Sequence, residues 1–212
     1  MNSSTIQDEK YWATRDDNWP ESYWRIKNHP HRAFQLDAIK TLYPFKSVLD
    51  VGCASGGAIA VIKDRFNLKD VNLAGVDVSE RAIAWAKDYQ PDIDFQVSDV
   101  SWLPFSNDSF DVVLTDACLI YVNPQKIRQA IKELSRVSKM GIVLLEWHDE
   151  ESIDGVSKDG HWARNYTKLL EELGYKVTTR KITEEVWPDA PSWAMHGMVY
   201  IAQAPLKTSE TN

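Results

Sequence analysis

Short apolar runs alternate with stretches of helical period along this chain, which is the pattern of an α/β domain. Residues 48–51 form an apolar run that ends abruptly in small residues, which predicts a buried parallel strand entering a glycine turn. A helix is expected from about 56 to 66, because apolar residues recur there on one face. A second short strand, 71–77, ends in an acid, Asp77. This order of strand, glycine turn, helix, strand and acid is typical of a site for an adenosine. The acid accepts hydrogen bonds from the ribose hydroxyls.

The alternation continues to the end of the chain, without an internal repeat or a domain linker. Ser79 is placed to cap a helix. Further helices are expected from 123 to about 137 and from 161 to 174. The remaining apolar runs predict strands at 93–97, 110–115, 141–146, 175–182 and 198–204.

The N-terminal part of the chain has a different composition. Aromatic and basic side chains are interleaved between residues 8 and 43, and Pro20 and Pro30 each suit the first turn of a helix. Two interpretations remain open. The rings pack on the edge of the sheet, or the segment is a lid over a ligand. In the second case four side chains are expected to face inward: Trp24, Arg25, His29 and Arg32.

The overall composition narrows the class of protein. The 212 residues suffice for one α/β domain with little elaboration, and the formal net charge of -7 disfavours nucleic acid and acidic membranes as partners. Cys53 and Cys118 form no CxxC pair, so neither a disulfide framework nor a metal site is expected. The chain shows neither an apolar run of membrane-spanning length nor a secretory signal, so we expect a cytoplasmic protein.

The glycine turn carries a specific resemblance. The run Asp50-Val51-Gly52-Cys53-Ala54-Ser55-Gly56 resembles the first motif of the class I S-adenosylmethionine (SAM)-dependent methyltransferases, an acid followed by G-x-G-x-G. Ala54 stands where that family often has its middle glycine. The resemblance implies that Asp77 binds the ribose of SAM, with Val78 beside it. It also implies which residues lie against the methionine part: Asp50, Gly52, Cys53, Ala54 and Gly56.

A second run strengthens the resemblance. Asp99 is followed by Leu103-Pro104-Phe105 and then by a strand beginning at Phe110, which is similar to the small-molecule branch of the same family. The resemblance implies that the Asp99 carboxylate accepts from the adenine amino group and that the Val100 NH meets a ring nitrogen. Asp116, at the end of the expected fourth strand, is expected to meet the methionine ammonium. Alone, Asp99 is explained as a turn cap, but the upstream motifs favour the cofactor.

The resemblance covers residues 47–145 and implies the fold of that family. This fold is a Rossmann-like, seven-stranded, mostly parallel sheet with an antiparallel last strand and helices on both faces. We expect a helical N-terminal extension at 1–45, the methyltransferase domain at 46–206 and a polar tail at 207–212. Residues 1–7 are polar and are expected to be disordered.

The chemistry of methyl transfer asks little of the protein beyond the cofactor site. The reaction is an in-line displacement that needs alignment, exclusion of water and, for a protic nucleophile, a base. His161 and His148 are the candidate bases and Tyr121 the candidate for orienting the acceptor, although each is also explained as a surface or packing residue. Of the nine tryptophans, seven are expected around the rim of the site. The candidate acceptor-binding residues are Trp24, Arg25 and Trp193.

These observations predict an enzyme that transfers a methyl group from SAM to O, N or C of a small-molecule acceptor and releases S-adenosylhomocysteine (SAH). No metal is expected, and the protein is expected to be a monomer or a homodimer. Two alternatives remain open. The first is an enzyme of the same fold that methylates a protein or RNA. The second is a SAM-binding or scaffold protein without catalysis.

Overall fold

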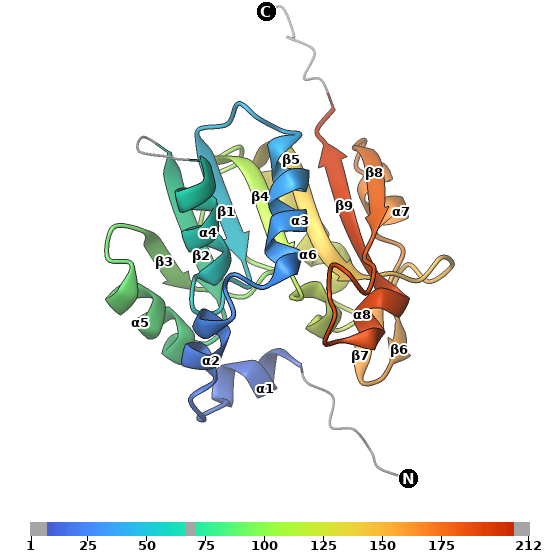
Figure 1. Ribbon diagram of the computed structural model, residues 1–212. Coiled ribbons are helices and arrows are strands. Elements are labelled where there is room, and N and C mark those ends of the chain that lie inside the picture. Colours follow the sequence, from blue (N-terminus) through green and yellow to red (C-terminus); the bar gives the residue numbers. More distant parts are fainter. Residues whose placement is uncertain (1–7, 67–70, 206–212) are drawn as a thin grey trace, which may run out of the picture.

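A seven-stranded sheet with helices on both faces forms the body of the protein (Figure 1). The computed structural model describes residues 8–66 and 71–205. The strands follow the order β3-β2-β1-β4-β5-β9-β8 across the sheet. Their bounds are β1 Ser47–Val51, β2 Asn72–Asp77, β3 Asp94–Val97, β4 Phe110–Asp116, β5 Ser138–Trp147, β8 Lys176–Lys181 and β9 Gly197–Gln203.

The pairing directions confirm the predicted fold. β1 pairs in parallel with β2 and β4, and β2–β3 and β4–β5 are also parallel. β9 is the last strand of the chain, and it is antiparallel to both of its neighbours, β5 and β8. The chain therefore builds a Rossmann-like sheet whose strand order reverses between β1 and β4, which is where such sheets bind ligands.

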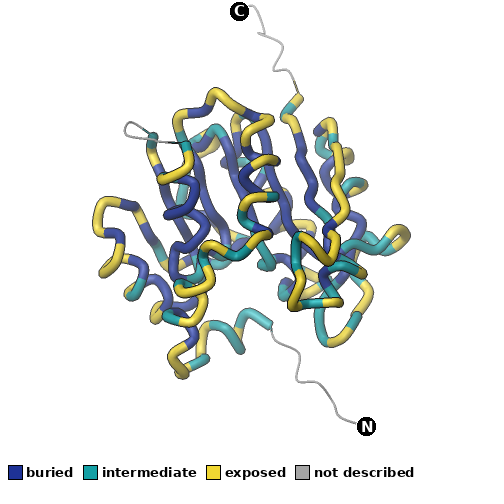
Figure 2. The backbone as a smooth tube through the Cα atoms, viewed as in Figure 1, coloured by how far each residue is buried: buried dark blue, intermediate teal, exposed yellow. Residues whose placement is uncertain are grey.

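The helices cover the two faces because successive strand residues point to opposite sides. Val48 packs in one core with α3, α4 and α5, whereas its neighbour Leu49 packs in the other with α6 and α7. Figure 2 shows the central strands buried between these layers. The helices are α1 Glu9–Thr14, α2 Trp19–Arg25, α3 Pro30–Lys40, α4 Gly57–Phe66, α5 Glu80–Tyr89, α6 Ile127–Val137, α7 Tyr166–Glu171 and α8 Pro191–His196, with a short 3-10 turn, η1, at Leu119–Tyr121.

The segment expected to be a helix from residue 161 is different. β6 (Val156–Lys158) and β7 (His161–Ala163) form an antiparallel hairpin, and α7 begins only at Tyr166. Asp159 and Gly160 connect the two strands with φ angles of 47° and 80°. A two-residue turn with two positive φ angles matches the twist of a hairpin, and Asp-Gly is its strong sequence signal. The prediction of a helix there was wrong because the helical period of the residues downstream outweighed that signal.

The remaining expectations concern smaller features. The helix expected from residue 123 begins at Ile127, because the Asn123 side chain accepts from the Gln125 NH and forms a turn instead. The expected disorder of 1–7 and the polar tail at 207–212 lie outside the described residues. In the described part of the chain, none of the helices has the length and apolar character needed to cross a membrane.

Candidate active site

A cavity of about 360 Å³ lies at the carboxyl ends of the parallel strands, at the point where the strand order reverses. The turns after β1, β2, β3 and β4 line one side of it. The other side is lined by α1, α2, α3, η1, the end of β5, β7, α8 and the segment that leads into α8. We call the first part the strand-end wall and the second part the aromatic wall.

The glycine turn after β1 has no room for larger residues at two positions. Gly52 and Gly56 both have a φ of 78°. A Cβ on Gly52 would lie 2.5 Å from Cys118 Sγ, and one on Gly56 would lie 2.7 Å from the ring of Phe95. Ala54, between them, has a φ of 49°, a conformation that strains any residue with a Cβ. The turn therefore has a left-handed backbone at Gly52, Ala54 and Gly56, and only the two glycines adopt it without strain.

Asp77 joins this turn to the end of β2. Its Oδ2 accepts from the Ala54 NH and its Oδ1 from the Ser79 NH, both at 2.9 Å. A carboxylate oxygen accepts more than one hydrogen bond, so both oxygens retain capacity toward the cavity that Asp77 lines. Burial raises the pKa of Asp77, and the backbone hydrogen bonds oppose that rise. The carboxylate is thus fixed in place for a pair of hydroxyl donors.

Asp50, at the end of β1, is buried and lacks a full set of partners. Its Oδ1 has no hydrogen-bond donor among the described residues. Burial raises the pKa of Asp50 to about 7, although Arg32 opposes this. An unpartnered carboxylate oxygen at a cavity wall fits a cationic group, because such a group supplies both a donor and a counter-charge.

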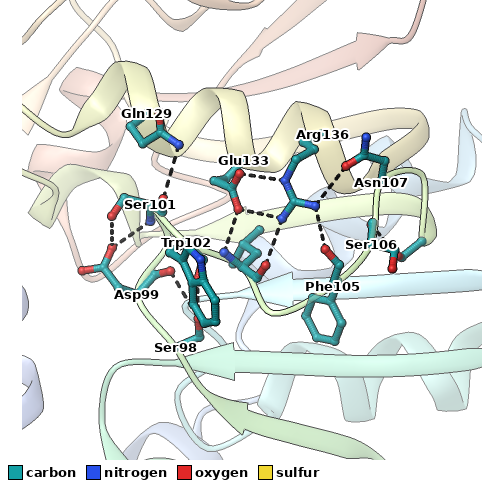
Figure 3. A network of polar contacts seen from close by, with 12 residues as sticks. Ser98, Asp99, Ser101, Trp102, Phe105, Ser106, Asn107, Gln129, Glu133 and Arg136 are labelled. Atoms are coloured by element: carbon teal, nitrogen blue, oxygen red, sulfur yellow. Dashed lines mark hydrogen bonds and ion pairs between the residues drawn. The ribbon is translucent and has the colours of Figure 1, made fainter.

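Asp99, after β3, is held in a polar network (Figure 3). Its Oδ1 accepts from the NH and hydroxyl of Ser101 at 2.7 and 2.6 Å, and its Oδ2 from Lys126 at 3.2 Å. Burial acts against ionisation, but these hydrogen bonds lower the pKa of Asp99. Lys126 also donates to Glu9 of α1 at 2.5 Å, so it connects the N-terminal helix to this part of the cavity.

The loop that follows Asp99 is anchored on α6. Glu133 accepts from the Leu103 NH at 2.8 Å, and Arg136 donates to the carbonyls of Leu103 and Phe105 at 2.9 and 2.6 Å (Figure 3). Arg136 and Glu133 also form an ion pair. The Leu-Pro-Phe run is therefore a structural anchor for the Asp99 turn rather than part of the cavity lining.

Asp116, at the end of β4, is already paired. Arg32 of α3 donates to it, and His31 Nε2 lies 3.2 Å from its Oδ2. Burial opposes ionisation of Asp116, but the Arg32 guanidinium and the hydrogen bond with His31 lower its pKa. Asp116 therefore lines the cavity, but Arg32 of the N-terminal extension already balances the charge that was expected to meet the methionine ammonium.

The aromatic wall is a set of rings in mutual contact. Trp187 stacks between His31 and Trp193, with ring centroids 4.1 and 4.3 Å away. His161 lies against Trp147 at 4.7 Å and against Tyr121 at 5.2 Å. Trp12 of α1 contacts Tyr121 at 5.0 Å and Trp19 at 5.1 Å. All of these rings line the cavity.

Two buried ionisable side chains, Glu146 and Arg164, form hydrogen bonds with the backbone of η1, which carries Tyr121. Glu146 accepts from the backbone NH groups of residues 118, 119 and 120 at 3.1–3.2 Å. Arg164, which is fully buried, donates to the carbonyls of Leu119 and Val122. Each side chain satisfies backbone groups that would otherwise be unpaired in the interior. The position of the Tyr121 ring therefore depends on Glu146 and Arg164.

The structure places three of the predicted site residues away from the cavity. Trp24 packs against Trp85 and Tyr89 on α5. Arg25 is exposed and pairs with Glu21 on its own helix. His148 Nδ1 lies 2.6 Å from the Tyr200 hydroxyl, and its Nε2 lies 2.9 Å from Glu150. Among the predicted residues that line the cavity are Tyr121, His161, Trp193, Arg32, Asp50, Gly52, Cys53, Ala54, Asp77, Val78, Asp99, Val100 and Asp116.

Gly56 is outside the lining but shapes the turn. His29 does not line the cavity either, but its ring lies 4.7 Å from His31 and 5.2 Å from Trp187. The prediction missed Trp12, Glu146 and Arg164. Glu146 had a signal, since an acid at the end of an apolar strand needs internal partners.

Comparison with known proteins supports the resemblance seen in the sequence. Residues 48–141, somewhat less than half of the chain, match the model of a methyltransferase domain. Over these residues the chain is similar to methyltransferases. Norajmaline N-methyltransferase of Rauvolfia serpentina is 31% identical over 107 residues, which are 48% of this chain and 36% of that protein. The 2-methyl-6-phytyl-1,4-hydroquinone methyltransferase of Synechocystis is 31% identical over 128 residues, which are 57% of this chain and 38% of that protein. The chain thus spans less than two fifths of the length of either relative.

Solved structures of methyltransferases have a similar fold. A SAM-dependent methyltransferase from Aquifex aeolicus has a TM-score of 0.64 at 14% identity, over 90% of this chain and 99% of that one. Geranyl diphosphate C-methyltransferase from Streptomyces coelicolor, in complex with SAH, has a TM-score of 0.67 at 13% identity, over 91% and 86%. The cofactor of this class is SAM, and the unpartnered Asp50 oxygen and the fixed Asp77 carboxylate fit its ammonium and its ribose.

Proposed function

We propose that the protein transfers the methyl group of SAM to a small-molecule acceptor. The observation that carries this proposal is the single cavity in which the strand-end wall and the aromatic wall meet. The strand-end wall has the carboxylates that a SAM molecule needs, and the aromatic wall lines the same cavity with rings that suit a second, apolar ligand.

Four residues of the strand-end wall have separate tasks. Asp50 binds the ammonium group, Asp77 accepts from the ribose hydroxyls, and Asp99 with the NH of Val100 recognises adenine. When bound, SAM supplies an activated methyl group on a sulfonium. The rings of the aromatic wall exclude water and align the acceptor, which is most of what this displacement requires.

The rings of the aromatic wall support a small-molecule acceptor, because a pocket lined by apolar rings with a few polar groups is typical of a small-molecule site. We also propose that the protein works in the cytoplasm as a monomer or homodimer and does not act on nucleic acid. The two free cysteines and the formal net charge of -7 support these points.

Calorimetric titration with SAM and SAH tests the proposal. The wild-type protein is expected to bind both in the micromolar range, about −8 kcal/mol. Asp77→Ala is expected to weaken binding about 100-fold or more, because it removes two hydrogen bonds to a charged acceptor, each worth about 1.5–3 kcal/mol. Thermal unfolding would verify that the variant is folded.

Asp94→Ala is the matched control, since Asp94 is an exposed acid on the neighbouring strand β3. It is expected to bind like the wild type. If folded wild-type protein bound neither ligand, the methyltransferase proposal would be wrong.

A further inference from the structure

His161 occupies a defined position on the aromatic wall. It begins β7 directly after the Asp159–Gly160 turn, and it pairs with Lys158 across the hairpin. Its ring lies against Tyr121 of η1 and Trp147 of β5. The imidazole is therefore held at the cavity by the hairpin on one side and by two aromatic rings on the other.

The hydrogen bond of His161 fixes its tautomer. Nδ1 lies 3.0 Å from the carbonyl oxygen of Asp159. A carbonyl oxygen only accepts, so Nδ1 must carry the proton, and Nε2 of the neutral ring then has a free lone pair. Among the described residues, no group is bonded to that Nε2. The ring thus presents a proton acceptor at a wall of the cavity.

The groups around His161 keep it neutral near pH 7. Burial lowers its pKa, and the Asp159 carbonyl bond and carboxylate oppose this only in part. From η1 it faces Tyr121, whose hydroxyl stays protonated because burial raises its pKa. From β5 it faces Trp147, which does not titrate. The lone pair on Nε2 is therefore present under ordinary conditions.

The charges of the cavity select against anionic acceptors. Of the described residues that line it, Arg32 alone has a permanently cationic side chain, and Asp116 already pairs with it. The other charged residues of the lining are carboxylates: Glu9, Asp50, Asp77 and Asp99. A phosphate or carboxylate on the acceptor would lose hydration without gaining a counter-charge. Flat, uncharged rings gain contact with the aromatic wall instead.

We propose that the acceptor is a neutral aromatic alcohol and that Nε2 of His161 is the base that takes its hydroxyl proton. This inference rests on the proposed function. The acceptor oxygen forms a bond to the methyl carbon while the carbon–sulfur bond breaks, and sulfur keeps that electron pair. The hydroxyl proton moves to Nε2 and leaves to solvent after the products dissociate. A hydroxyl needs such a base because it is a weak nucleophile until it loses its proton.

A matched pair of probes tests the acceptor class. 2-Naphthol and 2-naphthyl phosphate share one ring system and differ in charge, and both would be titrated by calorimetry into SAH-saturated protein. We expect 2-naphthol to bind at least tenfold more tightly. Equal or tighter binding of the phosphate, or binding of neither probe to SAH-loaded protein, would overturn the inference. Failure of SAH itself to bind would instead refute the proposed function, so the two failures are distinguishable.

A substitution tests the base. His161→Asn keeps an NH donor near the place of Nδ1 and removes Nε2. We expect kcat for methylation of 2-naphthol to fall about 10²- to 10⁴-fold, with KM and the Kd of SAH within threefold of wild type. The residual rate is expected to rise tenfold per pH unit near neutrality, because only ionised naphthol then reacts.

His148→Asn is the control, the same substitution at a histidine outside the cavity, and it should leave kcat and its pH profile unchanged. The assignment of the base fails if His161→Asn retains the wild-type kcat, or if wild-type protein binds 2-naphthol without methylating it.

Discussion

The strand-end wall and the aromatic wall belong to one cavity but are built in different ways. The strand-end wall consists of turns that directly follow consecutive parallel strands, so the sheet itself sets its geometry. The aromatic wall is assembled from α1, η1, the end of β5, β7, α8 and the segment before α8, which are far apart in sequence and whose rings meet through side-chain packing. The comparison shows that backbone geometry determines the cofactor side and that side-chain packing determines the acceptor side.

The two walls also differ in their charges. The strand-end wall keeps a buried carboxylate oxygen, on Asp50, without a partner. The aromatic wall uses its buried charges for structure, because Glu146 and Arg164 are engaged by the backbone of η1. Loss of a charge should therefore weaken ligand binding on the first wall and destabilise the fold on the second. Two substitutions test this difference, and a third tests the backbone strain of the glycine turn.

Arg164→Met should have the largest effect. It removes a fully buried guanidinium and leaves the carbonyls of Leu119, Val122 and Asp154 without their donor. We expect a loss of about 3–5 kcal/mol in the free energy of unfolding, measured with urea. The Kd of SAH for the folded fraction should stay within threefold of wild type. Arg128→Met, which removes exposed ion pairs to Asp154 and Glu172, should cost less than about 1 kcal/mol.

Asp50→Asn should have an intermediate effect that depends on pH. Burial raises the folded-state pKa of Asp50 to about 7, above the value of roughly 3.9 for an unfolded chain. The stability that Asp50 contributes is therefore complete below about pH 4 and is lost as the pH rises to about 7. The ligand-free variant should then be more stable than wild type by roughly 4 kcal/mol at pH 8 and by much less at pH 5.

The same variant should bind SAM more weakly, since it lacks the charge that faces the ammonium. Urea unfolding at the two pH values and calorimetry would measure both effects. An equal change in stability at pH 5 and pH 8 would show that Asp50 does not carry a raised pKa.

Ala54→Gly should have the smallest effect. The left-handed backbone of Ala54 costs about 1–2 kcal/mol, and glycine removes that strain at an entropic cost of about 0.4–1 kcal/mol. We expect the free energy of unfolding, measured by thermal unfolding, to rise by about 0.5 kcal/mol, and the SAH affinity to be preserved. Ala60→Gly, in the interior of α4, is the control, and its effect should have the opposite sign. It should lower the free energy of unfolding by about 1 kcal/mol. Similar losses in both variants would mean that the turn is not strained at Ala54.

The sequence predicts the strand-end wall well because local signals specify it. Gly52 and Gly56 have the positive φ angles that their place in the motif implies, and Asp77 and Asp99 follow their strands. The aromatic wall is different, because tryptophans pack wherever space allows. Trp193 and Trp24 have similar surroundings in sequence, yet one lines the cavity and the other packs on α5. Only the tertiary structure distinguishes them.

For His161, by contrast, the sequence predicts the position at the cavity but not the local structure that carries it. His161 was expected to begin a helix, and the Asp-Gly signal for the turn was present but was outweighed. The residue reaches the cavity all the same, although for a different structural reason. Its neighbours Trp147 and Tyr121 come from β5 and η1, and no local pattern brings these three together.

The division of the cavity is tested most directly by titrating SAH, and then 2-naphthol in the presence of SAH, into Asp77→Ala and Trp193→Ala. If the two walls bind separate ligands, Asp77→Ala should lose SAH binding about 100-fold or more. Trp193→Ala should keep the Kd of SAH within threefold of wild type and should lose at least tenfold in 2-naphthol affinity. If Trp193→Ala lost SAH as strongly as Asp77→Ala, or kept its 2-naphthol affinity, the division into a cofactor wall and an acceptor wall would be wrong.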